Sequence, residues 1–181
     1  RWPSVSSHRR KAGLTNEAST PAIAAAIAAT SKNGRTTNAT ATIAGAAGGA
    51  VLVVPMLDER TVLLIREYAA GVERYELALP KGVVEDGESP IEAANREIME
   101  EVGYGARRLT HLKSVTLAPG YFSHATHLVL AQELYPERRP GDEPEAIEVV
   151  PWSLDRLTEL CERDECTEAR SIAALFLVRE R

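Results

Sequence analysis

The sequence has few cysteines and few aromatic residues, and it shows no internal repeat. Two cysteines, Cys161 and Cys166, among 181 residues are too few for a disulfide framework, and they favour a reducing, cytoplasmic location. We expect both to be ordinary packing residues. With 44% hydrophobic and 26% charged residues, the composition excludes collagen-like, disulfide-scaffold and wholly disordered chains. The length suits one compact domain with some residues to spare.

Basic residues are scarce in the larger part of the chain. Residues 1–50 carry six basic residues and one acid, whereas residues 51–181 carry fifteen basic and twenty-five acidic residues. Affinity for nucleic-acid phosphates comes from clustered lysine and arginine, so we expect no nucleic-acid partner. If the acidic part binds phosphates at all, it needs cations to do so.

A long apolar run that would cross a membrane is also lacking. The stretch 36–57 is uncharged over 22 residues, but its first two-thirds is small and polar, and Pro55 lies near its end. We therefore expect no membrane partner.

Residues 1–50 differ from the rest of the chain and are rich in Ala, Thr and Ser. A basic, acid-poor, Ser/Thr-rich composition is typical of transit peptides, so a targeting extension is one interpretation. A displaced reading frame is another, and a flexible tail is the one we favour. We expect a low-complexity, poorly ordered segment over 1–50 and a folded domain over 51–181.

From Val51 onward, short aliphatic runs alternate with turn and helix signals. The runs 51–57 and 62–65, separated by the charged residues Asp58, Glu59 and Arg60, predict a hairpin. Further strands are predicted over 75–79, 112–117, 127–134 and 147–151, and closing helices over 154–161 and 167–178. This mixture predicts an α/β or α+β layered fold.

One segment, Gly82 to Tyr104, carries unusually complete helix signals. Ser89 is a predicted N-cap, Pro90 takes the first helical position, and Glu92 completes a capping box. Gly103 is the natural terminator. The sequence therefore predicts a helix from about Pro90 to Val102.

The helical period separates apolar from acidic side chains on this helix. One arc contains Ile91, Ala94, Ile98 and Val102 and should pack on the sheet. A neighbouring arc carries three glutamates that repel one another at these spacings, namely Glu97, Glu100 and Glu101. Hard Mg²⁺ prefers carboxylate oxygens and would turn the repulsion into a metal site. An acidic triplet is more often a solvated face, so the spacing alone leaves both interpretations open.

The wider pattern around these glutamates favours the metal site over the solvated face. Gly82, then five residues, Glu88, then seven, then REIMEEVGY over 96–104 matches every specified position of the Nudix box. The sequence thus resembles the Nudix hydrolase family. The resemblance covers 51–181 and is strongest to the bacterial ADP-compounds hydrolases of the NudE type, in the ADP-ribose pyrophosphatase branch. Its further matches are 64–68, 75–77, 93–97, 134–137, 141–145, 168–170 and 174–178, with the branch's marker proline at Pro119.

The resemblance implies an α/β fold, an α/β/α sandwich with a mixed sheet, whose box at 82–104 forms loop, helix and loop. It implies metal-dependent hydrolysis of the pyrophosphate bond of ADP-ribose, NADH or diadenosine polyphosphates, with release of AMP. It also implies Mg²⁺ or Mn²⁺ as the cofactor, a nucleoside diphosphate derivative as the small-molecule partner, and a homodimer.

The resemblance further implies a ligand set for the metal. It assigns Glu97, Glu101 and Glu100 as ligands, together with the backbone carbonyl of Lys81. Arg96 cannot lose its proton and is placed to hold a ligand glutamate in orientation. A water molecule would then attack phosphorus, mainly through positioning and electrostatics.

The general base and the substrate contacts are further expectations. The branch often takes its base from a mobile acidic loop, which corresponds here to 142–145. Glu143 is our first choice for the base and Glu145 the second, and Glu100 competes from within the box. Candidate substrate-binding residues are Arg66, Glu76, Tyr121 and Phe122, although Glu76 can be structural and the two aromatic residues can equally be core.

Two rival functions fit the same residues. One is a nucleotide-sugar pyrophosphatase of the same fold, and the other is a catalytically silent module that only binds nucleotides. Silent modules usually have broken box carboxylates, and every one is intact here.

The resemblance does not extend before Val51. Family members have strand-forming sequence there, whereas residues 1–50 of this chain lack the alternation of a strand.

Overall fold

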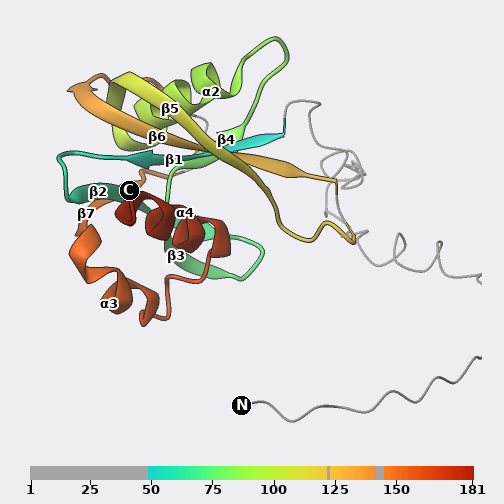
Figure 1. Ribbon diagram of the computed structural model, residues 1–181, viewed down its shortest axis with the longest axis vertical. Coiled ribbons are helices and arrows are strands. Elements are labelled where there is room, and N and C mark those ends of the chain that lie inside the picture. The colour runs from blue at the N-terminus through green and yellow to red at the C-terminus, as the bar shows by residue number, and fades with distance from the viewer. Residues whose placement is uncertain (1–48, 122, 142–144) are drawn as a thin grey trace, which may run out of the picture. The chain divides into compact units, whose positions relative to one another are not determined.

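The computed structural model describes residues 49–121, 123–141 and 145–181, so almost all of the predicted tail lies outside the described residues. Along the described chain, four strands precede the box helix, and three further strands precede the closing helices (Figure 1). In order these are β1 (Ala50–Pro55), β2 (Thr61–Ala69), β3 (Arg74–Ala78), β4 (Lys81–Val83), α2 (Pro90–Glu97), η1 (Ile98–Val102), β5 (Tyr104–Thr116), β6 (Ala125–Pro136), β7 (Glu148–Ser153), η2 (Leu154–Arg156), α3 (Leu157–Cys161) and α4 (Ala169–Arg179).

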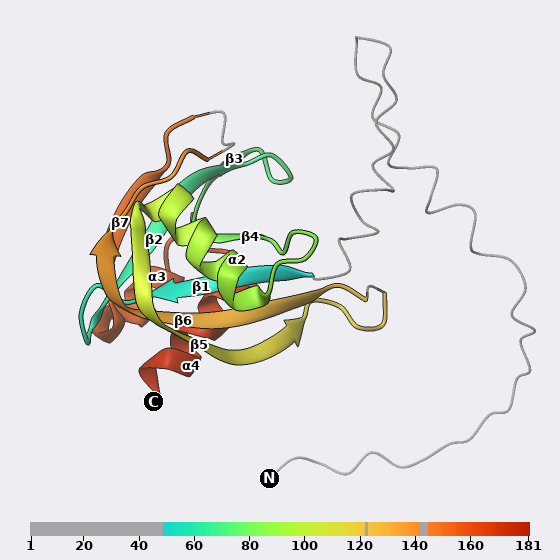
Figure 2. The ribbon, with the colours of Figure 1, turned by 90° about the horizontal axis from the view of Figure 1, so that it is seen from above.

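The described strands form two sheets. One has the order β4-β1-β6-β5 and the other has the order β3-β2-β7. The pairing of β1 with β6 is parallel and all other pairs are antiparallel, so the first sheet is mixed. Seen from above, α2 lies across the strands of this sheet (Figure 2).

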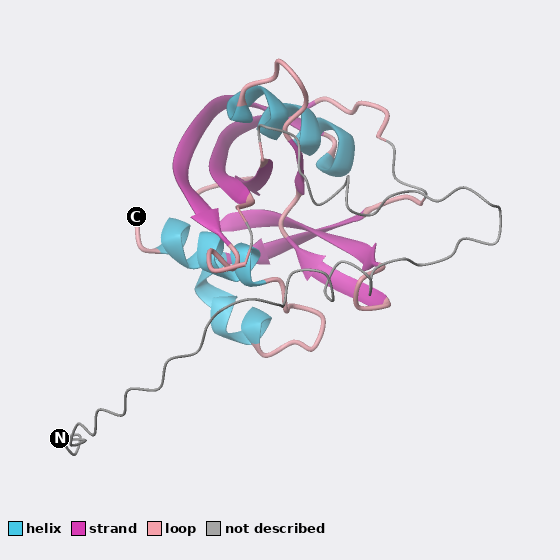
Figure 3. Cartoon of the chain, turned by 90° about the vertical axis from the view of Figure 1, so that its right-hand side faces the viewer, coloured by secondary structure: helices cyan, strands magenta, loops and turns pink. Residues whose placement is uncertain are grey.

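Strand β1 is buried along its whole length because it separates two hydrophobic cores. Val53 belongs to a core with Ile98 at the end of the box helix, and Leu52 belongs to a second core with Leu175 of α4. Helix α2 therefore covers one side of the strands, and α3 and α4 cover the other (Figure 3). The predicted three-layer arrangement is confirmed.

The predicted hairpin over 51–65 is only half correct. Asp58 Oδ1 accepts hydrogen bonds from the backbone N–H groups of Arg60 and Thr61, both at 2.8 Å, and this fixes the expected turn. After one bridge between Met56 and Val62, however, β1 and β2 enter different sheets. The turn is encoded locally, whereas β1 pairs with β4 and β6, which lie far along the chain.

The predicted helix from Pro90 to Val102 is present, but its last turn is wider than an α-helical turn. Residues 98–102 form a π-helical turn, in which the Gly103 N–H bonds to the Ile98 carbonyl. Gly103 then ends the helix in the left-handed region at φ 80°. Such π-turns are frequent at functional sites, and this one contains Glu100 and Glu101.

The other predicted elements agree with the structure to within a few residues, except for β5. This strand begins at Tyr104 rather than near Leu112, because it pairs with β6 from Tyr104 onward, and its first half was missed because it includes the charged Arg107 and Arg108. Among the described helices, none is long and apolar enough to cross a lipid bilayer.

Candidate active site

A capping box fixes where the site helix starts. The Glu92 N–H donates to Ser89 Oγ at 3.3 Å, and the Ser89 N–H donates to Glu92 Oε2 at 2.9 Å. Pro90 occupies the first turn as predicted. The rest of the helix is thereby set in register against β4, which pairs with β1 from Lys81 to Val83.

Gly82 of β4 and Glu97 of α2 touch across this junction. A Cβ atom on Gly82 would overlap the Glu97 carboxylate. The glycine therefore allows a buried carboxylate to lie directly on the strand backbone, which explains why this position of the motif has no side chain.

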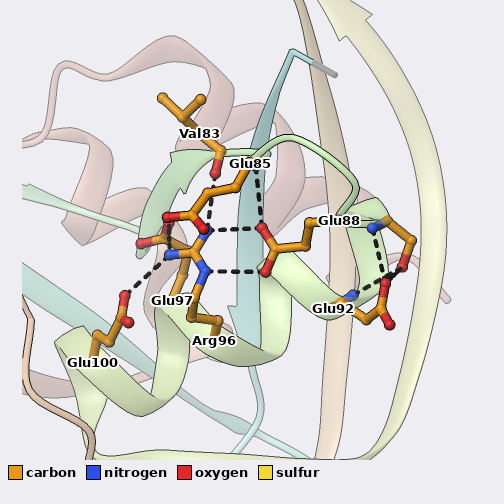
Figure 4. Close-up of polar contacts among 8 residues, drawn as sticks. Val83, Glu85, Glu88, Glu92, Arg96, Glu97 and Glu100 are labelled. Carbon is orange, nitrogen blue, oxygen red and sulfur yellow. Dashed lines mark hydrogen bonds and ion pairs between the residues drawn. The ribbon is translucent and has the colours of Figure 1, made fainter. Parts of the chain in front are cut away.

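Arg96 is the centre of an ionic network that joins three glutamates to the loop (Figure 4). Its Nε and Nη2 both donate to Glu88 at 3.0 Å, and Nη2 also donates to the Val83 carbonyl at 3.0 Å. Its Nη1 donates to Glu97 at 2.8 Å and to Glu100 at 3.1 Å. The bonds to Glu88 are the main cause that raises the pKa of Arg96. The same bonds lower the pKa of Glu88, so both side chains stay charged.

Glu97 and Glu101 are buried carboxylates, only 8% and 3% exposed. Burial raises the pKa of Glu97, against the opposing effect of Arg96. Burial likewise raises the pKa of Glu101 to about 8, although Lys81 is nearby and its N–H donates to Glu101 Oε2 at 3.1 Å. The fold holds two acids where their charged forms are unfavourable without a cation.

A cavity of about 480 Å³ opens beside Glu97, and Glu101 is not among its lining residues. Its lining is mostly polar and comes from 81–83, Glu85, Arg96, Glu97, Glu100, Pro140 and Gly141. Within the described ranges, no three acidic, imidazole or thiol side chains are already arranged as a metal cage. Arg96 instead bonds to both Glu97 and Glu100 through Nη1. The donor chemistry still fits a hard divalent cation, because the lining carries three carboxylates against Arg96 and Lys81, and Lys81 Nζ is paired with Glu67.

Lys81 connects this cavity with a second one. Its Nζ donates to Glu67 Oε2 of β2 at 2.8 Å. Both side chains line the second cavity, of about 280 Å³, whose other walls come from Ala69, Gly71, Val72, Glu76, Ala78, Thr167 and Glu168. Sequence reasoning missed Glu67, because the meeting of β2 with β4 is a tertiary contact.

Glu145, the one described residue of the predicted acidic loop 142–145, lies next to the box helix. Glu145 and Glu100 line one cavity of about 300 Å³. Glu145 also accepts a hydrogen bond from the Tyr75 hydroxyl at 3.1 Å, and this bond raises the pKa of Tyr75. Glu143, our first choice for the base, lies outside the described residues.

Arg66 and Glu76 are each engaged by neighbouring side chains. Arg66 bonds to Glu165 in the α3–α4 loop, and its Nε lies 3.1 Å from Glu148 Oε2. Glu76 accepts from Arg74 Nε at 2.6 Å and from the Thr167 hydroxyl at 2.8 Å. Glu76 lines the second cavity, whereas Arg66 is not among its lining residues.

Tyr121, one of the two predicted aromatic contacts, is not among the lining residues of the cavities described above. Tyr121 is 87% exposed in the β5–β6 loop and is not core, which corrects that interpretation of this residue. Phe122 lies outside the described residues. Of the two cysteines, Cys166 is buried and packs in the core as expected, and Cys161 is half-buried.

Comparison with known proteins identifies the fold. Residues 47–175 match the model of the NUDIX domain. The chain belongs to the Nudix family. This Nudix chain is 53% identical over 131 residues to the ADP compounds hydrolase NudE of Escherichia coli. The matched region covers 72% of this chain and 70% of the relative. It is 34% identical over 129 residues to the ADP-ribose pyrophosphatase of Bacillus subtilis, with 70% of each chain covered.

A solved structure supports the same conclusion. The crystal structure of an ADP compounds hydrolase matches this Nudix chain with a TM-score of 0.69 and 53% identity, over 72% of this chain and 70% of that one. The predicted family and α/β fold are therefore confirmed, as is the prediction of a Nudix pyrophosphohydrolase. The predicted site residues stay predictions.

Proposed function

We propose that this chain hydrolyses the pyrophosphate bond of ADP-ribose and related ADP compounds, including NADH and diadenosine polyphosphates, and releases AMP. The names of the two Nudix relatives support this substrate class. The observation that carries the proposal is the pair of buried acids, Glu97 and Glu101, on the box helix, with a polar cavity open beside Glu97 and Glu100.

The cofactor in this proposal is Mg²⁺ or Mn²⁺. Glu97, Glu101 and Glu100 would hold it, together with the Lys81 carbonyl. When bound, such a cation neutralises pyrophosphate oxygens and lowers the pKa of bound water. This fits an acidic groove, which would otherwise repel a polyanionic substrate.

The chain's own residues supply positioning and proton transfer. Arg96 fixes the carboxylates of Glu97 and Glu100, and Glu88 fixes Arg96 in turn. A loop carboxylate, Glu143 or Glu145, would take the proton from the attacking water, with Glu100 as the competing base. The position of Glu145 beside Glu100 supports this part of the proposal.

The remaining parts concern binding and assembly. We propose that Arg66, Glu76, Tyr121 and Phe122 contribute to substrate binding, and that the protein is a cytoplasmic homodimer. The proximity of Glu76 to Lys81 in one cavity supports its role, since Lys81 borders the candidate metal site as well.

A substrate panel tests the proposal. The protein is incubated with ADP-ribose, NADH, diadenosine triphosphate and GDP-mannose, in Mg²⁺, in Mn²⁺ and in EDTA, and products are separated by chromatography. We expect AMP from the ADP compounds and no turnover in EDTA. Preferential cleavage of GDP-mannose would instead identify a nucleotide-sugar pyrophosphatase. Binding without turnover of any compound would identify a silent module.

A matched pair of variants shows whether the turnover belongs to this site. Glu101→Gln should abolish most activity, whereas Glu59→Gln, in the exposed turn between β1 and β2, should leave it unchanged. Near-normal turnover by Glu101→Gln would remove this residue from the ligand set.

A further inference from the structure

Two arginines border the candidate metal site in a chain whose described part is mainly acidic. Arg138 and Arg139 follow β6 and line the cavity of about 300 Å³ that also contains Glu100 and Glu145. Glu100 and Gly141 line the candidate metal cavity as well, so the two cavities adjoin there. A substrate bound at one cavity can therefore extend into the other.

The box helix itself positions Arg138. Its Nη1 donates to the Glu100 backbone carbonyl at 3.2 Å. Its guanidinium lies against Gly103, where a Cβ atom would come within 2.8 Å of Nη2 and 2.9 Å of Nε. The chain on either side is bound to the same helix end, since the Arg139 N–H donates to the Met99 carbonyl at 3.1 Å.

The charge of Arg138 is not neutralised by a carboxylate of the described chain. No ion pair joins it to any described acid, and its single hydrogen bond to described residues is the one to the Glu100 carbonyl. Arg139 lies 3.7 Å from Glu137, at an exposed pair that contributes little binding energy. A guanidinium has five N–H donors in a planar fork, so Arg138 retains donors for a phosphate group.

We propose that Arg138, assisted by Arg139, forms a second anion subsite that binds a phosphate group beyond the pyrophosphate bond to be cleaved. The inference rests on the proposed function and adds to it a preference, among the ADP compounds, for those that carry additional phosphates, such as dinucleoside polyphosphates. Without the two arginines, each added phosphate would face Glu100 and Glu145 and be repelled. The subsite thus supplies the cationic charge that the metal cavity lacks on this side.

Two substrates that differ only in phosphate number test the subsite. Diadenosine diphosphate and diadenosine tetraphosphate share both adenosines, and kcat/KM is measured for each. We expect Arg138→Gln to lower the tetraphosphate value about tenfold while changing the diphosphate value less than about twofold. Arg138→Lys should retain part of the preference, because it keeps the charge but loses the fork. The matched control is Arg108→Gln, on the exposed edge strand and paired with Glu133.

A binding measurement separates the subsite from catalysis. Inorganic tripolyphosphate is titrated into metal-stripped protein by calorimetry, and Arg138→Gln should weaken its Kd about tenfold. If the wild type hydrolyses neither dinucleotide but this loss is still seen, the proposed function fails and the subsite stands. Equal losses on both dinucleotides would overturn the inference, because Arg138 would then act only through the Glu100 carbonyl. Unchanged kinetics and binding would overturn it too.

Discussion

Gly82 and Glu97 fit together only because the glycine has no side chain, since a Cβ atom there would overlap the Glu97 carboxylate. The strand backbone and a buried acid thereby approach each other directly at the edge of the candidate metal cavity. The absence of a side chain at Gly82 of β4 thus determines where the Glu97 carboxylate of α2 can lie.

Gly82→Ala should therefore damage the site more than the fold. The clash falls on the far end of a flexible side chain, so the carboxylate moves and the helix stays. We expect activity to fall about tenfold to a hundredfold, as for other displaced ligand geometry, with a small change in Tm. Gly120→Ala is the matched control, because a Cβ atom there meets open space. Full activity of Gly82→Ala would show that Glu97 need not occupy this position.

The buried carboxyl of Glu101 should make the thermal stability of the metal-free protein depend on pH. Burial raises its pKa from 4.5 to about 8, so the folded state keeps a proton that the unfolded chain releases. Its stabilising contribution is complete below the unfolded pKa and is lost as pH rises from about 4.5 to about 8. The Tm of metal-stripped wild type should therefore fall relative to Glu101→Gln across this window.

Addition of Mg²⁺ supplies the control for that experiment. A cation that binds only the folded state raises Tm, and the rise should be largely lost in Glu101→Gln. A Tm difference between the two proteins that does not change with pH would contradict the burial of an ionisable acid at this position.

Arg96→Lys tests the ionic network. Lysine keeps the charge but replaces a planar fork by three donors on a flexible stem, so it cannot join Glu88, Glu97 and Val83 at once. We expect activity to fall about tenfold to a hundredfold. Arg60→Lys, at an exposed pair with Asp155, should be neutral. Equal activities of the two variants would show that only the charge of Arg96 matters, and not its planar arrangement of donors.

Ile98→Ala tests which helix face is inward. Ile98 is fully buried in the core shared with β1, so its truncation leaves a cavity. The free energy of unfolding, measured by urea denaturation, should fall by about 2–5 kcal/mol. Leu117→Ala, at an exposed position, should change it little. An unchanged midpoint for Ile98→Ala would show that the packing is wrongly assigned.

The carboxylate of Glu168 should stabilise the folded protein at neutral pH but not in acid. It caps α4 by accepting from the Ser171 N–H at 2.7 Å and the Ser171 hydroxyl at 2.8 Å, and from Arg170 Nε at 2.7 Å. Burial alone would raise its pKa, but these bonds outweigh burial and hold the pKa below its usual value of 4.5. The contribution is therefore present above about pH 4.5 and lost as pH falls through the lower, folded pKa.

Glu168→Gln should accordingly destabilise the protein by about 0.5–2 kcal/mol near neutral pH, as for other lost caps. The difference from wild type should shrink in acid, where the wild-type carboxyl is protonated. Glu180→Gln, at the exposed end of α4, is the control. A difference that persists in acid would mean that the charge of Glu168 is not what stabilises the cap.

Sequence alone predicted those features that depend on neighbours along the chain. The capping box of Ser89 and Glu92, the stop at Gly103 and the buried arc that includes Ile98 all follow from interactions within one or two helical turns. For the same reason, the spacing of the box glutamates along the sequence predicted that they share one arc of the helix. The π-helical turn was missed, since 98–102 carries no local signal against an α-helical turn.

Contacts between distant segments were decided only by the tertiary structure. The turn at Asp58 was predicted, yet β1 leaves β2 to pair with β6, because both faces of β1 must be covered by the two cores. The same folding places Glu67 on Lys81 and Arg138 on the Glu100 carbonyl. Local hydrogen bonding fixes where an element begins and ends, whereas its neighbours are set by how the whole chain buries its apolar surface.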